Sequence, residues 1–181
     1  IAHARQLGIE VLAPDVNESE RDFAVVAEGI RFGLAGVKNV GEGAIEAIVE
    51  VRREQRFESL FDFASRIDSK RVNRRVVESL AKCGAFDSLH PSRAAVWAAL
   101  EGALDAGASA QRDRERGQGS LFGGAATAVH SEPALPAVAP WTDRERLVHE
   151  REVLGFYVTG HPLGAFAAQL RRFADTTGAT T

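Results

Sequence analysis

Lys38, Gly41 and Gly43 form the pattern with the clearest chemical potential in this sequence, because they directly precede a segment of helical periodicity that begins near Ile45. The first backbone N–H groups of a helix lack partners within it and lie at the positive end of its dipole, so they can bind a phosphate. Glycines at this point would let a nucleic-acid backbone approach closely, and Lys38 would add a full positive charge. The pattern predicts a phosphate-binding turn ahead of the helix.

The whole stretch from Leu34 to Arg52 resembles a helix-hairpin-helix element, which contacts nucleic-acid backbone rather than base sequence. Asn39 stands where such hairpins usually carry glycine, although asparagine tolerates the left-handed backbone region better than most residues. The flanking acids Glu42 and Glu46 would repel phosphate. The alternative interpretation is that the glycines form only a turn and a helix start.

Arg71, Arg74 and Arg75 cluster at the start of the next predicted helix, in the segment VNRRVVESLAKCGAF. They extend a local excess of basic over acidic residues between positions 51 and 75, which could face phosphates. The arrangement could be a second, poorer version of the same unit. The alternatives are a solvated helix surface and a helix that serves packing alone.

Catalytic and metal-binding constellations are not found in the sequence. Asp15 has no second carboxylate at a metal-binding spacing, the histidines are scattered, and no phosphate-gripping glycine loop occurs. The single cysteine, Cys83, excludes an internal disulfide and follows an apolar helical pattern, which indicates a buried side chain. We therefore predict no catalytic residue, no metal ligand and no cofactor for this chain.

The elements that must position these residues are mainly α-helical, with a small β-hairpin near the N-terminus around Glu28 and Gly29. The 181 residues are 45% hydrophobic and 26% charged, as in soluble globular proteins, and no apolar run is long enough to cross a membrane. Helices are predicted from Gly41, within FESLFDFASRID, from Asn73 to Gly84, from Ser92 to about Arg112, after a Thr142–Glu145 capping box, and from GHPL onward. The chain has no initiator methionine, and we expect a fragment of a longer protein.

Leu121 and Phe122 are exceptional, because they lie among glycines in the segment 117–140, which is otherwise rich in alanine and proline. This composition predicts a flexible linker. Neighbours of this kind cannot easily bury two large apolar side chains. Burial by a partner is the first interpretation, and burial against the helices of this chain is the alternative.

Several segments, in this order and at close to these spacings, together resemble the C-family replicative DNA polymerases of bacteria, the alpha subunit of DNA polymerase III. The segments are GIEVLAPDVNES, IRFGLAGVKNVGEGAIEAIVEVR, FESLFDFASRID, VNRRVVESLAKCGAFD and EREVLGFYVTGHPL. The resemblance implies the end of the fingers domain over 1–32 and a helix-hairpin-helix, clamp-binding domain over 33–116. It further implies a linker over 117–140 and a helical connector over 141–181 that leads toward an OB-fold.

The resemblance also implies function. The parent enzyme would be a DNA-directed DNA polymerase, a cytoplasmic nucleotidyltransferase with its catalytic carboxylates and Mg²⁺ in an upstream palm domain. This chain would contact duplex DNA through Lys38, Asn39, Gly41, Gly43, Arg71, Arg74 and Arg75. A clamp-binding peptide of the family, Gln-x-Ser/Asp-Leu-Phe, matches Gln118, Ser120, Leu121 and Phe122. The implied partners are DNA, the sliding clamp and other subunits of the replicative holoenzyme, with no membrane.

Three alternatives remain at this point. An error-prone paralogue of the same family would share the region, although such paralogues often carry a degraded clamp peptide. A helix-hairpin-helix scaffold of DNA repair would share the hairpin. A helical spacer without DNA contact would share only the fold.

Overall fold

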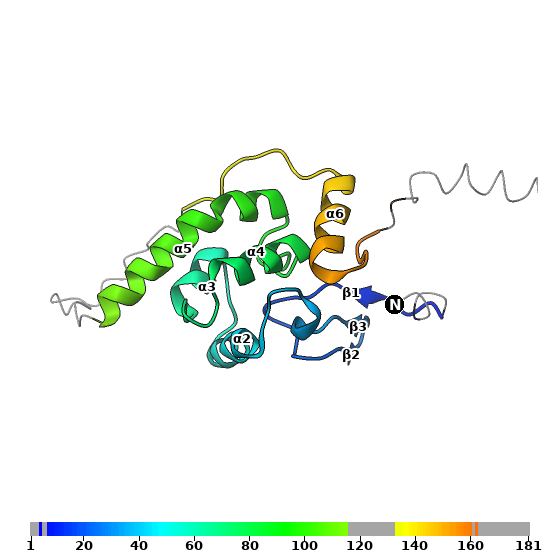
Figure 1. The fold of residues 1–181 in the computed structure, drawn as a ribbon, viewed down its shortest axis with the longest axis horizontal. Coiled ribbons are helices and arrows are strands. Elements are labelled where there is room, and N and C mark those ends of the chain that lie inside the picture. Colours follow the sequence, from blue (N-terminus) through cyan, green and yellow to red (C-terminus); the bar gives the residue numbers. More distant parts are fainter. Residues whose placement is uncertain (1–3, 5–6, 116–132, 161, 163–181) are drawn as a thin grey trace, which may run out of the picture.

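The computed structural model describes residues 4, 7–115, 133–160 and 162, and these form a mainly helical body with a small sheet near the N-terminus, as predicted (Figure 1). The helices are η1 (Leu34–Gly36, a 3-10 turn), α2 (Glu42–Glu54), α3 (Leu60–Arg66), α4 (Arg74–Cys83), α5 (Arg93–Glu115) and α6 (Asp143–Leu154). α3 packs against α5, and α4 packs against both α5 and α6. In the view of Figure 1, α5 extends to the left, away from the sheet.

The sheet contains the predicted hairpin and one strand pairing that was not predicted. The strands are β1 (Val11–Leu12), β2 (Ala24–Val26) and β3 (Gly29–Arg31), in the order β1-β3-β2. β2 and β3 are antiparallel, with Val25 opposite Ile30, whereas β1 runs parallel to β3 with Val11 opposite Ile30. A Cβ on Gly29 would lie 2.3 Å from the carbonyl oxygen of Glu10, so only glycine allows β1 to approach.

The loop after β1 is built from short polar side chains that bond to backbone. The Asp15 carboxylate accepts the N–H groups of Asn17 (2.7 Å) and Glu18 (3.1 Å), which uses it in a turn. The Asn17 amide then donates to the carbonyl of Phe57 (2.9 Å) and accepts its N–H (2.8 Å). This reciprocal pair fastens the N-terminal segment to the residues that lead into α3.

The predicted helix ends are confirmed where the sequence carries capping residues. The Asn73 side chain accepts the N–H of Val76, and Gly84 ends α4 in the left-handed region at φ 84°. Thr142 and Glu145 form the predicted capping box at the start of α6. α5 extends to Glu115, slightly beyond the predicted end. The predicted last helix lies outside the described residues.

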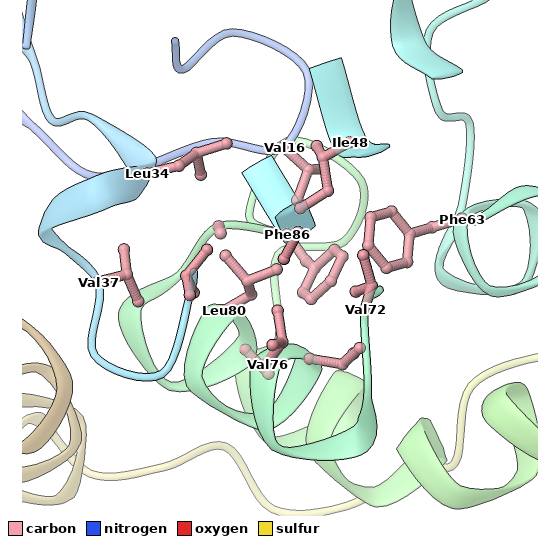
Figure 2. Close-up of a cluster of buried hydrophobic side chains, with 14 of the residues drawn as sticks. Val16, Leu34, Val37, Ile48, Phe63, Val72, Val76, Leu80 and Phe86 are labelled. Carbon is pink, nitrogen blue, oxygen red and sulfur yellow. The ribbon is translucent and has the colours of Figure 1, made fainter. Parts of the chain in front are cut away.

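One hydrophobic cluster joins all the described helices, from η1 to α6, and Figure 2 shows part of it. Phe63 of α3 is fully buried in it, and its ring centroid lies 4.8 Å from that of Phe57 and 5.1 Å from that of Phe86. Val16, from the loop after β1, and Val153, from α6, belong to the same cluster. The cluster therefore contains residues from both sides of the predicted domain boundaries near residues 32 and 140.

Residues 133–140, at the end of the predicted linker, have no regular secondary structure. Leu135 is half-buried against the core, and Trp141 lies against α5 and α6, with its ring centroid 6.1 Å from that of Trp97. Within the described ranges, no helix has the length and apolar character needed to cross a membrane.

Candidate nucleic-acid interface

The turn between η1 and α2 has an anchored base and an exposed tip. Val37 and Val40 are buried, at 2% and 7% exposure, and the N–H of Val40 donates to the carbonyl of Val37 (3.1 Å). Lys38 and Asn39, between them, are exposed. The two buried valines hold the turn against the core and leave Lys38 and Asn39 at its exposed tip. The element at the place of the first helix of the predicted helix-hairpin-helix is only the short 3-10 turn η1.

Asn39 is the one non-glycine residue with positive φ in the described part of the chain, at 68°. The expectation that asparagine can replace glycine here is confirmed. Its side-chain amide also donates to the hydroxyl of Ser79 on α4 (2.9 Å), a bond that glycine could not make. The backbone N–H of the neighbouring Lys38 donates to the carbonyl of Val153 on α6 (2.8 Å). The hairpin is thus fixed to both α4 and α6.

The start of α2 presents open hydrogen-bond donors. Gly41 is the N-cap and provides no side-chain cap, and in the described structure the N–H groups of Gly41, Glu42 and Gly43 have no acceptor. A Cβ on Gly41 would meet nothing within 4 Å, and one on Gly43 only the Nε of Arg71, at 3.9 Å. Packing among the described residues therefore requires neither glycine. Their effect is to leave the surface around the donors clear for an external anion.

The acids that flank this site are neutralised by arginines. Glu42 pairs with Arg21 (2.9 Å), and Glu46 pairs with Arg71 (2.7 Å). Arg71 also reaches Glu50, at 3.5 Å. These pairs reduce the repulsion expected from Glu42 and Glu46, but they also occupy Arg71, one of the predicted DNA-binding residues.

The three predicted arginines have different surroundings. Arg74 donates to Glu78 on its own helix (2.8 Å) and lies 3.9 Å from Glu101 of α5; the hydrogen bond to Glu78 is the main cause that raises the pKa of Arg74. Arg75 and Lys38 make no ion pair with any described residue. They share a polar pocket of about 110 Å³ beside the hairpin. The structure thus brings together Lys38, Asn39 and Arg75, places Arg71 beside Gly43, and directs Arg74 elsewhere.

The predicted second, poorer hairpin unit contains α4, and most residues of that helix serve packing. Val76, Val77 and Leu80 are at most 3% exposed and belong to the core. α4 begins with the Asn73 side-chain cap followed by arginines, whereas α2 begins with glycines and has no side-chain cap. This favours the packing interpretation over a second phosphate-binding hairpin.

The predicted clamp-binding residues Gln118, Ser120, Leu121 and Phe122 lie outside the described residues. The described chain on either side of them is part of the body. α5 ends at Glu115, and residues 133–141 lead back to the capped start of α6.

A buried ion pair that the sequence analysis missed holds α6 in place. Glu150 is fully buried and accepts from the Arg93 guanidinium (2.9 Å), from the N–H groups of Val158 (2.8 Å) and Thr159 (3.1 Å), and from the Thr159 hydroxyl (2.8 Å). Arg93 also pairs with Asp87 (2.7 Å). One sequence feature could have indicated a buried, paired carboxylate here: Glu150 lies on the apolar face of its predicted helix, three residues after Leu147.

Two other kinds of reactive site, a reactive thiol and a metal centre, are absent from the described residues. Burial raises the pKa of the Cys83 thiol to about 12, which makes it unreactive at neutral pH. In the described part of the chain, no three His, Cys, Asp or Glu side chains are grouped so that they could hold a metal ion. The open N–H groups at the start of α2, beside Lys38, are the feature of this region that could bind an anion.

Comparison with known proteins agrees with this geometry. A family model described as a helix-hairpin-helix motif matches residues 8–96. Proteins named DNA polymerase III subunit alpha from Caulobacter vibrioides, Saccharopolyspora erythraea and Pseudomonas aeruginosa are 42%, 39% and 39% identical over 93%, 97% and 96% of this chain. The chain spans only 15%, 15% and 16% of the length of those relatives.

Proposed function

We propose a DNA-holding role for this chain, which belongs to the DNA polymerase III alpha family and corresponds to one segment of that larger protein. In this role the segment contacts the backbone of duplex DNA and tethers the polymerase to its sliding clamp, so that synthesis is processive. The observation that carries the proposal is the uncapped, glycine-lined start of α2 beside Lys38.

At the DNA contact, a phosphate accepts hydrogen bonds from the free N–H groups at Gly41 and Gly43, where the helix dipole adds partial positive charge. Lys38 and Arg75 supply full charges from the exposed rim. Asn39 holds the turn in shape rather than contacting phosphate, because its amide is bonded to Ser79. Such a site recognises backbone and not sequence, which suits an enzyme that must hold any template.

For the clamp contact, Leu121 and Phe122 insert as anchors into an apolar cleft of the clamp, and the amide of Gln118 bonds at its rim. Ser120 completes the peptide, and Gly119 occupies its variable position. A glycine there raises the ordering cost of the peptide, so the expected affinity is modest. Modest affinity suffices, because a clamp that encircles the same DNA makes rebinding effectively intramolecular.

The larger protein is proposed to be a cytoplasmic DNA-directed DNA polymerase with its catalytic carboxylates and Mg²⁺ in a palm domain upstream of this chain. Within it, residues 1–32 end the fingers domain, 33–116 form the helix-hairpin-helix domain, 117–140 link, and 141–181 lead toward an OB-fold. Other holoenzyme subunits are the remaining partners.

The substitution Gly41→Asp tests the DNA contact. Aspartate is a favoured N-cap, and open space surrounds Gly41, so the helix should fold at least as well. The carboxylate, however, takes the place of the phosphate. We expect duplex affinity, measured by fluorescence anisotropy, to fall about tenfold, because a fixed negative charge replaces a phosphate contact. Gly102→Asp, at an open position on α5, adds the same charge elsewhere and serves as the control. Equal affinities of the two variants would refute the contact at the hairpin.

The double substitution of Leu121 and Phe122 by alanine tests the clamp contact. Surface plasmon resonance should show loss of clamp binding, while affinity for DNA without the clamp is unchanged. Val138→Ala, which shortens an exposed apolar side chain in residues 133–140, should bind the clamp normally. Unaltered clamp affinity of the double variant would overturn the assignment.

A further inference from the structure

A basic groove lies where the loop between α3 and α4 meets the C-terminal end of α5, and the function proposed above does not use it. The groove has a volume of about 730 Å³. Its cationic lining residues are Arg66, Lys70, Arg112 and Arg114, and Asp68 is the acid among the residues that line it. We name it the α5 groove. Its lining is polar and cationic, with Ala108 as the apolar member.

The cations of the α5 groove are of two kinds. Arg66 has a structural role, because it pairs with Asp62 (2.9 Å) and donates to the carbonyl of Val51 at the end of α2 (3.1 Å). Lys70, Arg112 and Arg114 make no ion pair with any described residue. These three positive charges are therefore available to a ligand.

The guanidinium groups are oriented without being neutralised. The Nε of Arg112 donates to the carbonyl of Ala108 (3.2 Å), and Arg114 donates to the carbonyl of Ser65 on α3. The carboxylate of Asp68 accepts the backbone N–H of Lys70 (2.9 Å), which engages the acid of the groove in the turn. Oriented guanidinium groups beside a free ammonium suit a phosphate oxyanion.

The position of the α5 groove favours a polymer that also reaches the hairpin. Lys70 is adjacent in sequence to Arg71, whose Nε lies 3.9 Å from where a Cβ of Gly43 would be. One short loop therefore borders both the start of α2 and the α5 groove. Lys70 and Arg112 are exposed and the groove is open, which fits a backbone that crosses the surface better than a small enclosed ligand.

We propose that the α5 groove binds a second stretch of phosphodiester backbone of the nucleic acid held at the hairpin. This inference rests on the proposed DNA contact and extends it to a site that lies beyond the helix-hairpin-helix motif. The free charges of Lys70, Arg112 and Arg114 carry it.

The test uses the double substitution Lys70→Ala and Arg112→Ala, which removes two exposed side chains and leaves the bond of Arg114 to α3 intact. Binding to a labelled duplex of about 20 base pairs is measured by anisotropy between about 50 and 200 mM salt. We expect the Kd to rise about tenfold and the slope of log K against log salt to fall by about 2, because each removed cation leaves about one phosphate no longer neutralised.

Arg144→Ala combined with Arg53→Ala is the charge-matched control, since both residues are exposed and lie outside the α5 groove. If the groove variant binds DNA like this control, with an unchanged salt slope, the inference is wrong. That result is distinguishable from failure of the hairpin contact, which Gly41→Asp reports separately. If instead a polyglutamate peptide binds the wild type and not the groove variant, while both bind DNA equally, the groove takes acidic peptide and the proposal is refuted.

Discussion

Replacement of Glu150 by glutamine is expected to destabilise the chain by about 3–5 kcal/mol, the cost of breaking a buried ion pair by removing one partner. Glu150 has 0% exposure, and Arg93 has 6%. The replacement conserves volume, so no cavity contributes. On a typical domain stability of about 5–15 kcal/mol, the loss would be a large fraction of the total.

The magnitude follows from the hydrogen bonds of the carboxylate. One oxygen accepts from Arg93 and the Thr159 hydroxyl, and the other accepts the N–H groups of Val158 and Thr159. A glutamine can keep one oxygen toward the two N–H groups, but its NH₂ then faces the Arg93 guanidinium, donor against donor. Arg93 retains Asp87 as a partner and cannot move to solvent. An unsatisfied charged group of this kind costs more than an ordinary lost hydrogen bond.

Urea unfolding followed by tryptophan fluorescence measures the effect, because Trp97 and Trp141 lie on the two sides of the contact between α5 and α6. Glu152→Gln is the matched control on the same helix. Its carboxylate is 49% exposed and pairs with Lys82, so its removal should cost no more than about 1 kcal/mol. Equal stabilities of the two variants near neutral pH would refute the reasoning.

The pH dependence gives a second check on Glu150. Burial by itself would raise the pKa of Glu150, but the hydrogen bonds from Thr159, Val158 and Arg93 outweigh it and lower that pKa. A carboxyl group with a lowered folded pKa stabilises the fold above its unfolded pKa of about 4.3 and loses this contribution as pH falls through the folded value. The difference between wild type and Glu150→Gln should therefore shrink below about pH 4.

Three further results are expected. Cys83, whose pKa burial raises to about 12, should react with a thiol reagent only as the chain unfolds, and fast labelling of the native chain would contradict its burial. Burial, followed by the charge of Lys82, lowers the pKa of His149, so its stabilising contribution is complete above the unfolded value of about 6.5 and is lost as pH falls. His149→Gln should flatten the stability profile below that value, and an NMR titration of the ring at or above the unfolded pKa would refute this. Glu46→Gln should remove the closer of the two carboxylates that engage Arg71 and raise duplex affinity about threefold in anisotropy assays. When Arg71 is already replaced by alanine, Glu46→Gln should no longer raise duplex affinity. An equal rise in that background would show that Glu46 acts by repelling the DNA phosphates and not by engaging Arg71.

The sequence predicts elements whose signals are local. Asn73 and Gly84 delimit α4, and Thr142 with Glu145 starts α6, because a cap acts on backbone groups a few residues away. The left-handed backbone conformation of Asn39 is likewise a local feature that the residue type predicts. These features could be inferred because their physical cause lies within one turn of the chain.

Features that depend on contacts between distant segments could not be inferred. Arg93 and Glu150 are far apart in sequence, and nothing in either neighbourhood specifies the other as a partner. The parallel pairing of β1 with β3 likewise depends on a close approach at Gly29. The basic excess counted between positions 51 and 75 overstated the charge available to phosphates for the same reason. Arg52, which contributes to the local basic excess, is nearly buried and donates to the carbonyls of Val16 and Ser19.

The hairpin that faces the proposed DNA is positioned by segments on both sides of the clamp-peptide region. Asn39 bonds to Ser79 on α4, which precedes that region, and Lys38 bonds to Val153 on α6, which follows it. Val153 is one turn from Glu150, so the buried ion pair with Arg93 supports the hairpin as well as α6. The segment that contains the proposed clamp peptide is joined to this body on both sides, at Glu115 of α5 and at residue 133. Under the proposed clamp contact, this double attachment raises the effective concentration of the peptide at a clamp on the same DNA, which compensates for the modest affinity expected from Gly119.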